Sequence, residues 1–235
     1  MERFAYLTAN LLLLPIVIFF FWKRPDLRQK ILTMGLVASP LGPISEFWFL
    51  KDYWRPQYAL GWPWIIEDFL FSFICGSSST VVYQVFFGKT LGERIYKRRD
   101  YYLFFLIPFG IINMAFLNNI LTINSIFASA FTLLTGTVIM LYSRRDLIKI
   151  SVATGTLIGL IAFVFYFLVL PLFPNILART WLLYNKPLGK TIIGIPLTEL
   201  IWAISLGFAA GPVYEFWQGY TVVPLNSSKT QPCDP

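Results

Sequence analysis

The sequence predicts an all-α integral membrane protein with about seven transmembrane helices, and three observations lead to this prediction. Of the 235 residues, 57% are hydrophobic and only 13% are charged, whereas a soluble domain carries about 25% charged residues. Apolar runs of about 20 residues recur along the chain, each long enough to cross a hydrocarbon core of about 30 Å. The runs lack the period-two alternation of barrel strands, and a span must satisfy its backbone hydrogen bonds internally, so helices are expected.

The polar segments between the runs set the expected organisation. We expect one membrane domain over 1–218, with a first repeat at about 1–88, a connecting span at about 101–119 and a second repeat at about 121–218. The polar tail at 219–235 has the composition of a disordered end. The expected spans are 4–22, 31–50, 63–88, 101–119, 121–142, 150–174 and 195–217.

The basic residues predict the orientation of the chain in a cell membrane. By the positive-inside rule, the loops richest in Lys and Arg face the cytoplasm. These are the first, third and fifth loops, so the N-terminus is expected outside and the C-terminus inside. The residues concerned are Lys23, Arg24, Arg28 and Lys30, then Lys89, Arg94, Lys97, Arg98 and Arg99, and then Arg144, Arg145 and Lys149.

Composition also limits the classes of binding partner that we expect. The net charge of +7 could indicate nucleic acid, but the basic residues cluster between apolar runs, where topology and lipid headgroups explain them. The chain has no histidine, and Cys75 and Cys233 have no metal-ligand spacing. No glycine-rich nucleotide-binding motif is present. We therefore expect membrane lipid and an apolar molecule as partners, and no nucleic acid, metal or cofactor.

Two stretches place carboxyl groups at the head of an apolar run. "WPWIIEDFLFSF" at 62–73 carries Glu67 and Asp68 behind a proline, and "GIPLTELIWAIS" at 194–205 carries Glu199 in the same way. Glu46 comes late in the run before the first motif. With the orientation above, all four acids lie toward the same, non-cytoplasmic side of the membrane, which is a condition for one shared site.

These acids have two possible explanations. A proline followed by acids is an ordinary helix start, in which the helix dipole stabilises a carboxylate by about 0.3–1 kcal/mol. An acid inside a span, however, costs about 2.5–3.5 kcal/mol at the helix centre and is a functional candidate for that reason. Glu46 has no helix start to explain it. Carboxyls of unequal pKa can donate and accept a proton, so the catalytic candidates are Glu67, Asp68, Glu199 and Glu46.

Aromatic residues accompany the acids and allow two interpretations. Tryptophans at a membrane interface typically form an aromatic belt. Alternatively, their π-faces could stabilise a positive charge that forms on a hydrocarbon. On the second interpretation, the candidates for substrate binding are Trp48, Trp64, Phe71 and Trp202.

The first half, "DYWRPQYALGWPWIIEDFLFSFICGSSSTVVYQVF", resembles the membrane-integral, non-flavin lycopene cyclase domain family. Its pattern is an acid late in one helix, an aromatic loop, a proline-x-Glu-Glu (or Glu-Asp) motif and a helix ending near Tyr-Glu. Glu46, Glu67 with Asp68, and Tyr83 with Gln84 fill these places. The second copy, "LLYNKPLGKTIIGIPLTELIWAISLGFAAGPVYEF", has Pro196, Glu199 and Tyr214 with Glu215.

The chain departs from the family pattern at three places. Ile65 stands where the family has its proline, Thr198 replaces the first of two acids, and the sixth span has no late acid to match Glu46. We therefore expect a lopsided site with most of its acids in the first repeat.

The resemblance implies a fused two-repeat cyclase, an intramolecular lyase or isomerase of carotenoid biosynthesis that closes rings on linear carotenoids without net redox change. An acid would protonate the terminal alkene and a base would remove a proton. A carotenoid hydratase-like enzyme and a non-catalytic carotenoid-binding, lipid-binding or transport protein are the alternatives. The sequence leaves the oligomeric state open.

Overall fold

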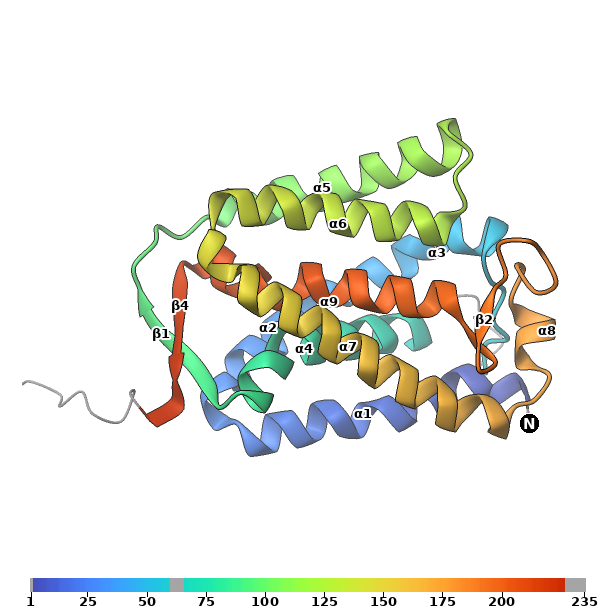
Figure 1. The fold of residues 1–235 in the computed structure, drawn as a ribbon, viewed down its shortest axis with the longest axis horizontal. Helices are drawn as coiled ribbons and strands as arrows, with labels where there is room; N and C mark the ends of the chain where they lie inside the picture. Colours follow the sequence, from blue (N-terminus) through green and yellow to red (C-terminus); the bar gives the residue numbers. More distant parts are fainter. Residues whose placement is uncertain (1, 60–65, 227–235) are drawn as a thin grey trace, which may run out of the picture.

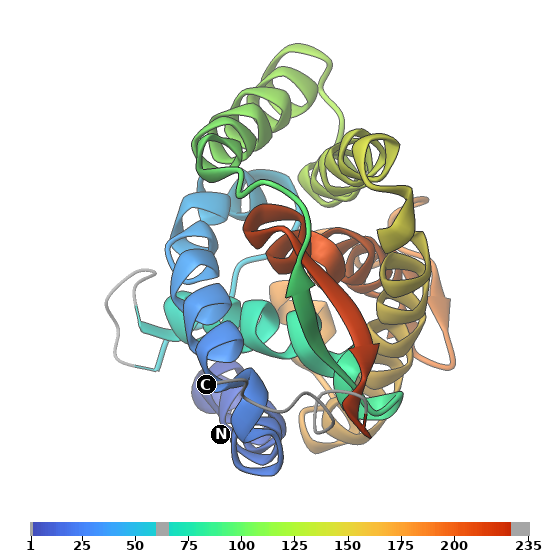
Figure 2. The same ribbon diagram turned by 90° about the vertical axis from the view of Figure 1, so that its left-hand side faces the viewer.

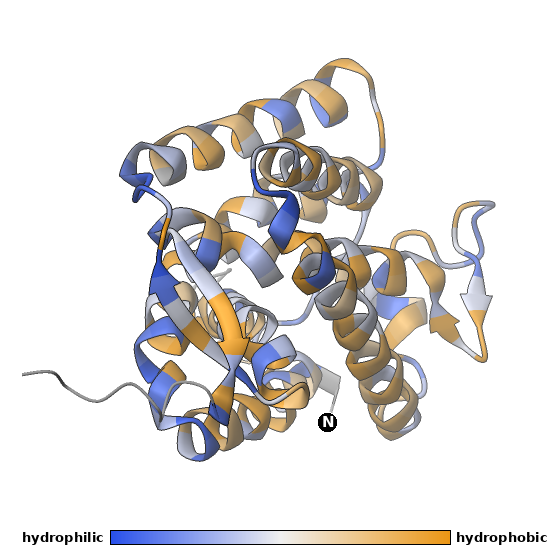
Figure 3. Ribbon diagram, turned by 60° about the vertical axis from the view of Figure 1, so that its left-hand side comes forward, coloured by the Kyte–Doolittle hydropathy of each residue, from blue (hydrophilic) through white to orange (hydrophobic). Residues whose placement is uncertain are grey.

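The structure is a computed structural model that describes residues 2–59 and 66–226, and its helices form an elongated bundle (Figure 1). Within these residues, six helices are long and apolar enough to cross a membrane. Apolar residues run along the helices, and hydrophilic residues are most frequent near the connections (Figure 3). The six are α1 (Ala5–Lys23), α4 (Ile66–Phe86), α5 (Asp100–Ala115, extended by a π-helical turn to Ile120), α6 (Ser125–Ser143), α7 (Ile148–Val169) and α9 (Leu197–Gln218).

The remaining elements are short. Two further helices, α2 and α3, follow α1, and one short helix with a small hairpin lies between α7 and α9. Single 3-10 turns precede α1, α2 and α7 and follow α7. Their bounds are α2 (Arg28–Ala38), α3 (Leu41–Asp52), α8 (Ile176–Thr180), β1 (Lys89–Arg94), β2 (Thr191–Ile192), β3 (Ile195–Pro196) and β4 (Tyr220–Pro224).

The span expected at 31–50 is two helices and not one. α2 ends at Ala38 and α3 begins at Leu41, with a turn at Ser39 and Pro40 between them. Proline has no backbone N–H to continue the helical hydrogen bonds. After the break, α3 packs closely against α4. A Cβ on Gly42 would lie only 2.3 Å from the Asp68 carbonyl oxygen. The broken segment thereby carries Glu46 toward the start of α4.

The bundle also contains β-structure that the all-α prediction omitted. β1 and β4 form an antiparallel ribbon with Lys89 opposite Pro224, and we call this end of the bundle the ribbon end (Figure 2). Gly219 ends α9 with a φ of 80° and turns the chain into β4. The tail therefore begins as a strand paired across the molecule, which corrects the expectation that disorder starts at residue 219. Residues 227–235 lie outside the described part.

Matching contacts occur in both halves of the chain. Arg24 forms an ion pair with Asp26, and Arg144 forms one with Asp146, at 2.7 and 2.6 Å. Both arginines also bind backbone carbonyls at the ribbon end: Arg24 binds those of Gln84 and Lys89, and Arg144 those of Glu215 and Tyr220. Each half thus attaches the turn after its first long helix to its part of the ribbon.

Candidate active site

Three of the four predicted acids meet at the end of the bundle opposite the ribbon. Glu46 comes from α3, Asp68 from the first turn of α4 and Glu199 from the first turn of α9. All three line one cavity of about 180 Å³, which we call the acid cavity. The helices of both halves therefore deliver carboxyl groups to a common space, as the expected common depth requires.

Asp68 accepts hydrogen bonds from two phenols. Tyr6 of α1 donates to one carboxylate oxygen at 2.8 Å, and Tyr58 of the loop after α3 donates to the other at 3.1 Å. Burial, followed by the nearby carboxylates of Glu46 and Asp68, raises the pKa of Tyr58 well above its ordinary value. Tyr58 therefore keeps its proton and remains a donor to Asp68.

Glu199 has the same kind of environment. Tyr166 of α7 donates to one of its oxygens at 2.6 Å, and Tyr53 at the end of α3 donates to the other. Burial and the carboxylate of Glu199 raise the pKa of Tyr53, so this phenol also stays protonated. The Thr198 hydroxyl lies 3.3 Å from the Tyr53 hydroxyl. Both oxygens of Glu199 are thus held by O–H donors from the other helices.

Glu46 differs from the other two acids. One of its carboxyl oxygens accepts a hydrogen bond from the indole N–H of Trp54 at 3.1 Å. Its second oxygen is buried and has no hydrogen-bond partner among the described residues. A carboxyl oxygen without a partner can carry a proton without displacing an existing hydrogen bond.

Among the described residues, Glu67 does not line the acid cavity. It is buried, and one of its oxygens accepts the backbone N–H of Ala59 at 3.1 Å. Neighbouring helix positions differ by about 100° in direction, which separates Glu67 from Asp68. Trp64 lies outside the described residues.

The predicted aromatic residues divide between two adjoining spaces. Phe71 and Trp202 line the acid cavity and stack with their ring centroids 6.0 Å apart and 19° between their planes. Trp48 lines a second cavity of about 330 Å³, to which Trp202 also contributes. The stacked pair therefore lies beside the carboxyl groups, and Trp48 lies in the adjoining space.

Four tyrosines and one tryptophan that bind the acids were not singled out as candidates. Tyr53, Trp54 and Tyr58 belong to the aromatic loop before the first motif, so that loop was a signal for them. Tyr6 and Tyr166 lie within apolar runs far from either motif. Tyr166 supplies the partner of Glu199 from the sixth expected span, in which no acid matching Glu46 was found.

The comparisons with known proteins agree with part of this picture. Residues 124–217 match the family model described as lycopene cyclase, which confirms the resemblance for the stretch from α6 to α9. The matched part contains Glu199, Tyr166 and Trp202. The search of curated proteins and the search of solved structures each gave no match.

Proposed function

We propose that the chain is a lycopene cyclase-like enzyme that closes rings at the ends of linear carotenoids by acid–base chemistry within the cell membrane. The observation that carries this proposal is the convergence of Glu46, Asp68 and Glu199 on one cavity with aromatic walls. The family match supports the same class of reaction.

The reaction needs a proton donor, and we assign this role to Glu46. Its second oxygen has no donor bound to it among the described residues, so this oxygen can hold the proton that the alkene receives. Transfer of this proton to the terminal double bond would make a tertiary carbocation. A positioned acid of this kind typically contributes about 10²–10⁴-fold to the rate.

The carbocation must then be held and discharged. The internal alkene attacks it and closes the ring, and the positive charge moves to a ring carbon. The stacked faces of Phe71 and Trp202 can stabilise a cation through their π-electrons. Asp68 or Glu199 would then accept a proton from the carbon beside the charge. One proton enters and one leaves, so no redox partner is required.

Glu67 has a proposed positioning role. Its bond to the backbone of Ala59 attaches the start of α4 to the loop that carries Tyr58, the partner of Asp68. The direct role of Glu67 in proton transfer that the sequence suggests remains a prediction.

We further propose that the two halves are related repeats with an outside N-terminus and a cytoplasmic C-terminus. The paired arginine contacts of Arg24 and Arg144 support the repeat. The excess of basic residues near the ribbon end supports the orientation. The acid cavity would then lie toward the outer face of the membrane.

A hydratase-like outcome is the second candidate. Thr198 and Tyr53 place two hydroxyl groups beside Glu199, and such a polar corner could hold a water molecule. Capture of the first cation by water would give a tertiary alcohol instead of a ring.

The test is expression of the full chain in a bacterial host that makes linear lycopene, followed by pigment analysis. Ring-containing products are expected, and their mass equals that of the substrate because ring closure is an isomerisation. A product heavier by one water would favour the hydratase. Unchanged lycopene, with the protein present in the membrane, would contradict both enzymes and leave a non-catalytic carotenoid or lipid carrier.

A further inference from the structure

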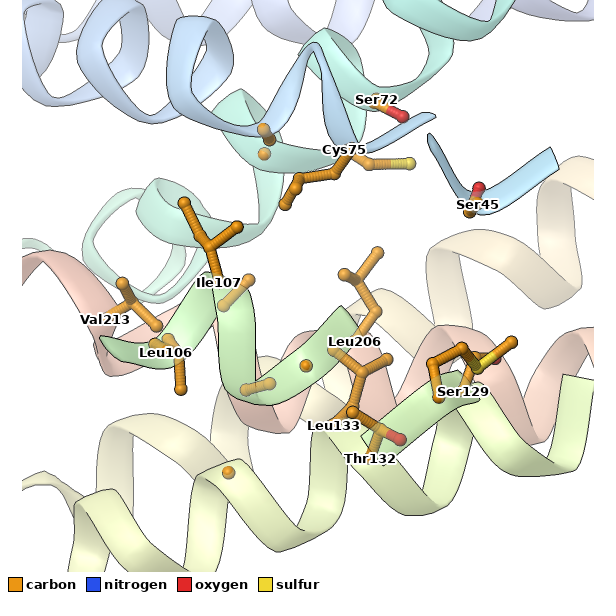
Figure 4. A pocket seen from close by; sticks show the side chains of 18 of the residues that line it. Ser45, Ser72, Cys75, Leu106, Ile107, Ser129, Thr132, Leu133, Leu206 and Val213 are labelled. Carbon is orange, nitrogen blue, oxygen red and sulfur yellow. The ribbon is translucent and has the colours of Figure 1, made fainter. Parts of the chain in front are cut away.

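The second cavity, of about 330 Å³, lies between the helices of both halves and the connecting helix α5. In Figure 4, side chains from α4, α5, α6 and α9 surround this space, among them Cys75, Ile107, Leu133 and Leu206. Its lining is almost wholly apolar. We call this space the chain channel.

Most hydroxyl groups in the channel wall form hydrogen bonds within the protein, and the buried Tyr102 hydroxyl is one that has no partner among the described residues. Thr80, Ser129 and Thr137 each donate to a carbonyl of their own helix. The Thr132 hydroxyl accepts the amide of Asn113 at 2.9 Å. An apolar occupant can therefore contact these four residues without breaking the hydrogen bonds of their hydroxyl groups.

The chain channel adjoins the acid cavity. Ser45, Phe49, Ser72 and Trp202 line both spaces. A molecule with one end beside the acids would have to pass Trp202 to reach the channel.

The length of the channel limits what it can hold. Its lining on α6 runs from Ser129 to Met140, which is about 16 Å along a helix. The hydrocarbon core of a bilayer is about 30 Å thick. The channel therefore accommodates part of an extended molecule that is long enough to span the bilayer.

From these features we propose that the chain channel binds the unreacted polyene portion of the substrate while a single end occupies the acid cavity. This inference rests on the proposed function and extends it: the enzyme processes one end of a linear isoprenoid at a time. The channel selects for long apolar chains, and its residues on α5 and α6 determine specificity without taking part in proton transfer.

Two glycines make the inference testable. Gly110 of α5 and Gly136 of α6 both line the channel. A Cβ on Gly110 would meet its nearest atom at 4.0 Å, and one on Gly136 at 3.5 Å. Both are ordinary contact distances, so a Cβ fits at either position, and the rest of a leucine side chain would take up space in the channel. Replacing glycine within a helix also favours the helix by up to about 1 kcal/mol.

The experiment compares Gly136→Leu and Gly110→Leu with matched controls on the lipid-facing sides of the same helices. Val138→Leu and Ile112→Leu are suitable controls, because these side chains are 67% and 68% exposed. Each purified protein in lipid nanodiscs receives linear lycopene or a shorter linear isoprenoid with the same reacting end. We measure the ratio of ring-forming rates on the long and short substrates, and the polyene absorbance of bound pigment.

We expect each glycine variant to lower the ratio of the rate on the long substrate to the rate on the short one by about tenfold or more, because the added side chain takes up volume that the long chain needs. Each variant should also bind less pigment. The controls should match the wild type. An unchanged ratio in both glycine variants would overturn the inference. If the wild type forms no rings, the proposed function fails, and pigment binding alone then decides: equal binding in all variants overturns the channel. Co-purified lipid acyl chains with no displacement by the polyene would also overturn it.

Discussion

The buried acids have different kinds of partner at the two ends of the bundle. At the ribbon end, Glu215 is fully buried and pairs with Lys30 at 2.5 Å, and Gln84 also donates to it. In the acid cavity, Asp68 and Glu199 are held by phenol hydroxyls, and Glu46 by an indole N–H. No ion pair to these three acids is present within the described residues.

This difference separates structural from chemical acids. A buried carboxylate with a cation beside it has its charge compensated. Carboxyl groups held by neutral donors at a cavity can exchange protons with a bound molecule. The ribbon end therefore connects the halves of the molecule, and the acid cavity provides the reactive groups.

The largest expected effect comes from removing the acids of the cavity. Glu46→Gln, Asp68→Asn and Glu199→Gln should each lower the rate of ring formation by about 10²–10⁴-fold, because an amide cannot donate or accept the required proton. Rates are measured per folded protein in nanodiscs. Asp100→Asn, at an exposed ion pair with Arg98, is the control. Wild-type rates in all three cavity variants would refute the assignment.

The next effect concerns stability at the ribbon end. Lys30→Met leaves the Glu215 carboxylate buried without its cation, which typically costs about 3–5 kcal/mol. Thermal unfolding in detergent should show a much lower midpoint. The double variant Lys30→Met with Glu215→Gln should recover most of the loss, since no charge is then uncompensated. Equal midpoints for the wild type and the single variant would disprove a structural role for this pair.

A smaller effect is expected when a phenol donor is removed. Tyr166→Phe deletes the 2.6 Å bond to Glu199, and hydrogen bonds to charged groups contribute about 1.5–3 kcal/mol. We expect the rate of ring formation to fall by about tenfold or more. Tyr142→Phe serves as the matched control, because Tyr142 of α6 is 81% exposed. The interpretation of Tyr166 as a positioning residue requires that the two variants differ and that the pH profile of Tyr166→Phe shifts.

The smallest expected effect is the change in stability at acid pH that comes from Asp26, in the turn after α1. Partial burial opposes its ionisation, but the hydrogen bonds from Arg24 and Thr90 outweigh this, and the pKa of Asp26 is lowered. Its folded pKa lies below the unfolded value of about 3.9. Asp26 therefore stabilises the fold above about pH 4, and this contribution is lost as the pH falls through the folded pKa.

Comparison of the wild type with Asp26→Asn measures this contribution. The difference in unfolding midpoint should be present at neutral pH and shrink below about pH 4. A difference that stays constant over this range would show that Asp26 does not contribute through its charge.

Six of the seven expected spans, and a shared location for three of the four acids, followed from the sequence. Apolar runs of sufficient length locate α1, α4, α5, α6, α7 and α9 to within a few residues, because crossing a bilayer demands that length. The break at Pro40 was harder to foresee, since a proline inside an apolar run can also sit within an unbroken helix, as Pro15 does in α1.

The partners of the acids depend on tertiary packing. Asp68 and Glu67 are neighbours in sequence, and only the packing of α1 and the aromatic loop against α4 shows that Asp68 lines the cavity. Tyr166 reaches Glu199 across 33 positions of sequence. The pairing of β4 with β1 likewise joins the ends of the two halves, and a five-residue segment such as β4 is too short to identify a strand from its sequence alone.

The most direct test of acid catalysis by the cavity follows the proton that is transferred to the substrate. Protein equilibrated in deuterium oxide is mixed with a smaller amount of lycopene, so that each molecule turns over once, and the product is analysed by mass spectrometry. Donation from an exchangeable carboxyl group predicts one deuterium for each ring, because the carbon that gains the proton differs from the carbon that loses one. Cyclic product without deuterium would contradict proton donation by the acid cavity.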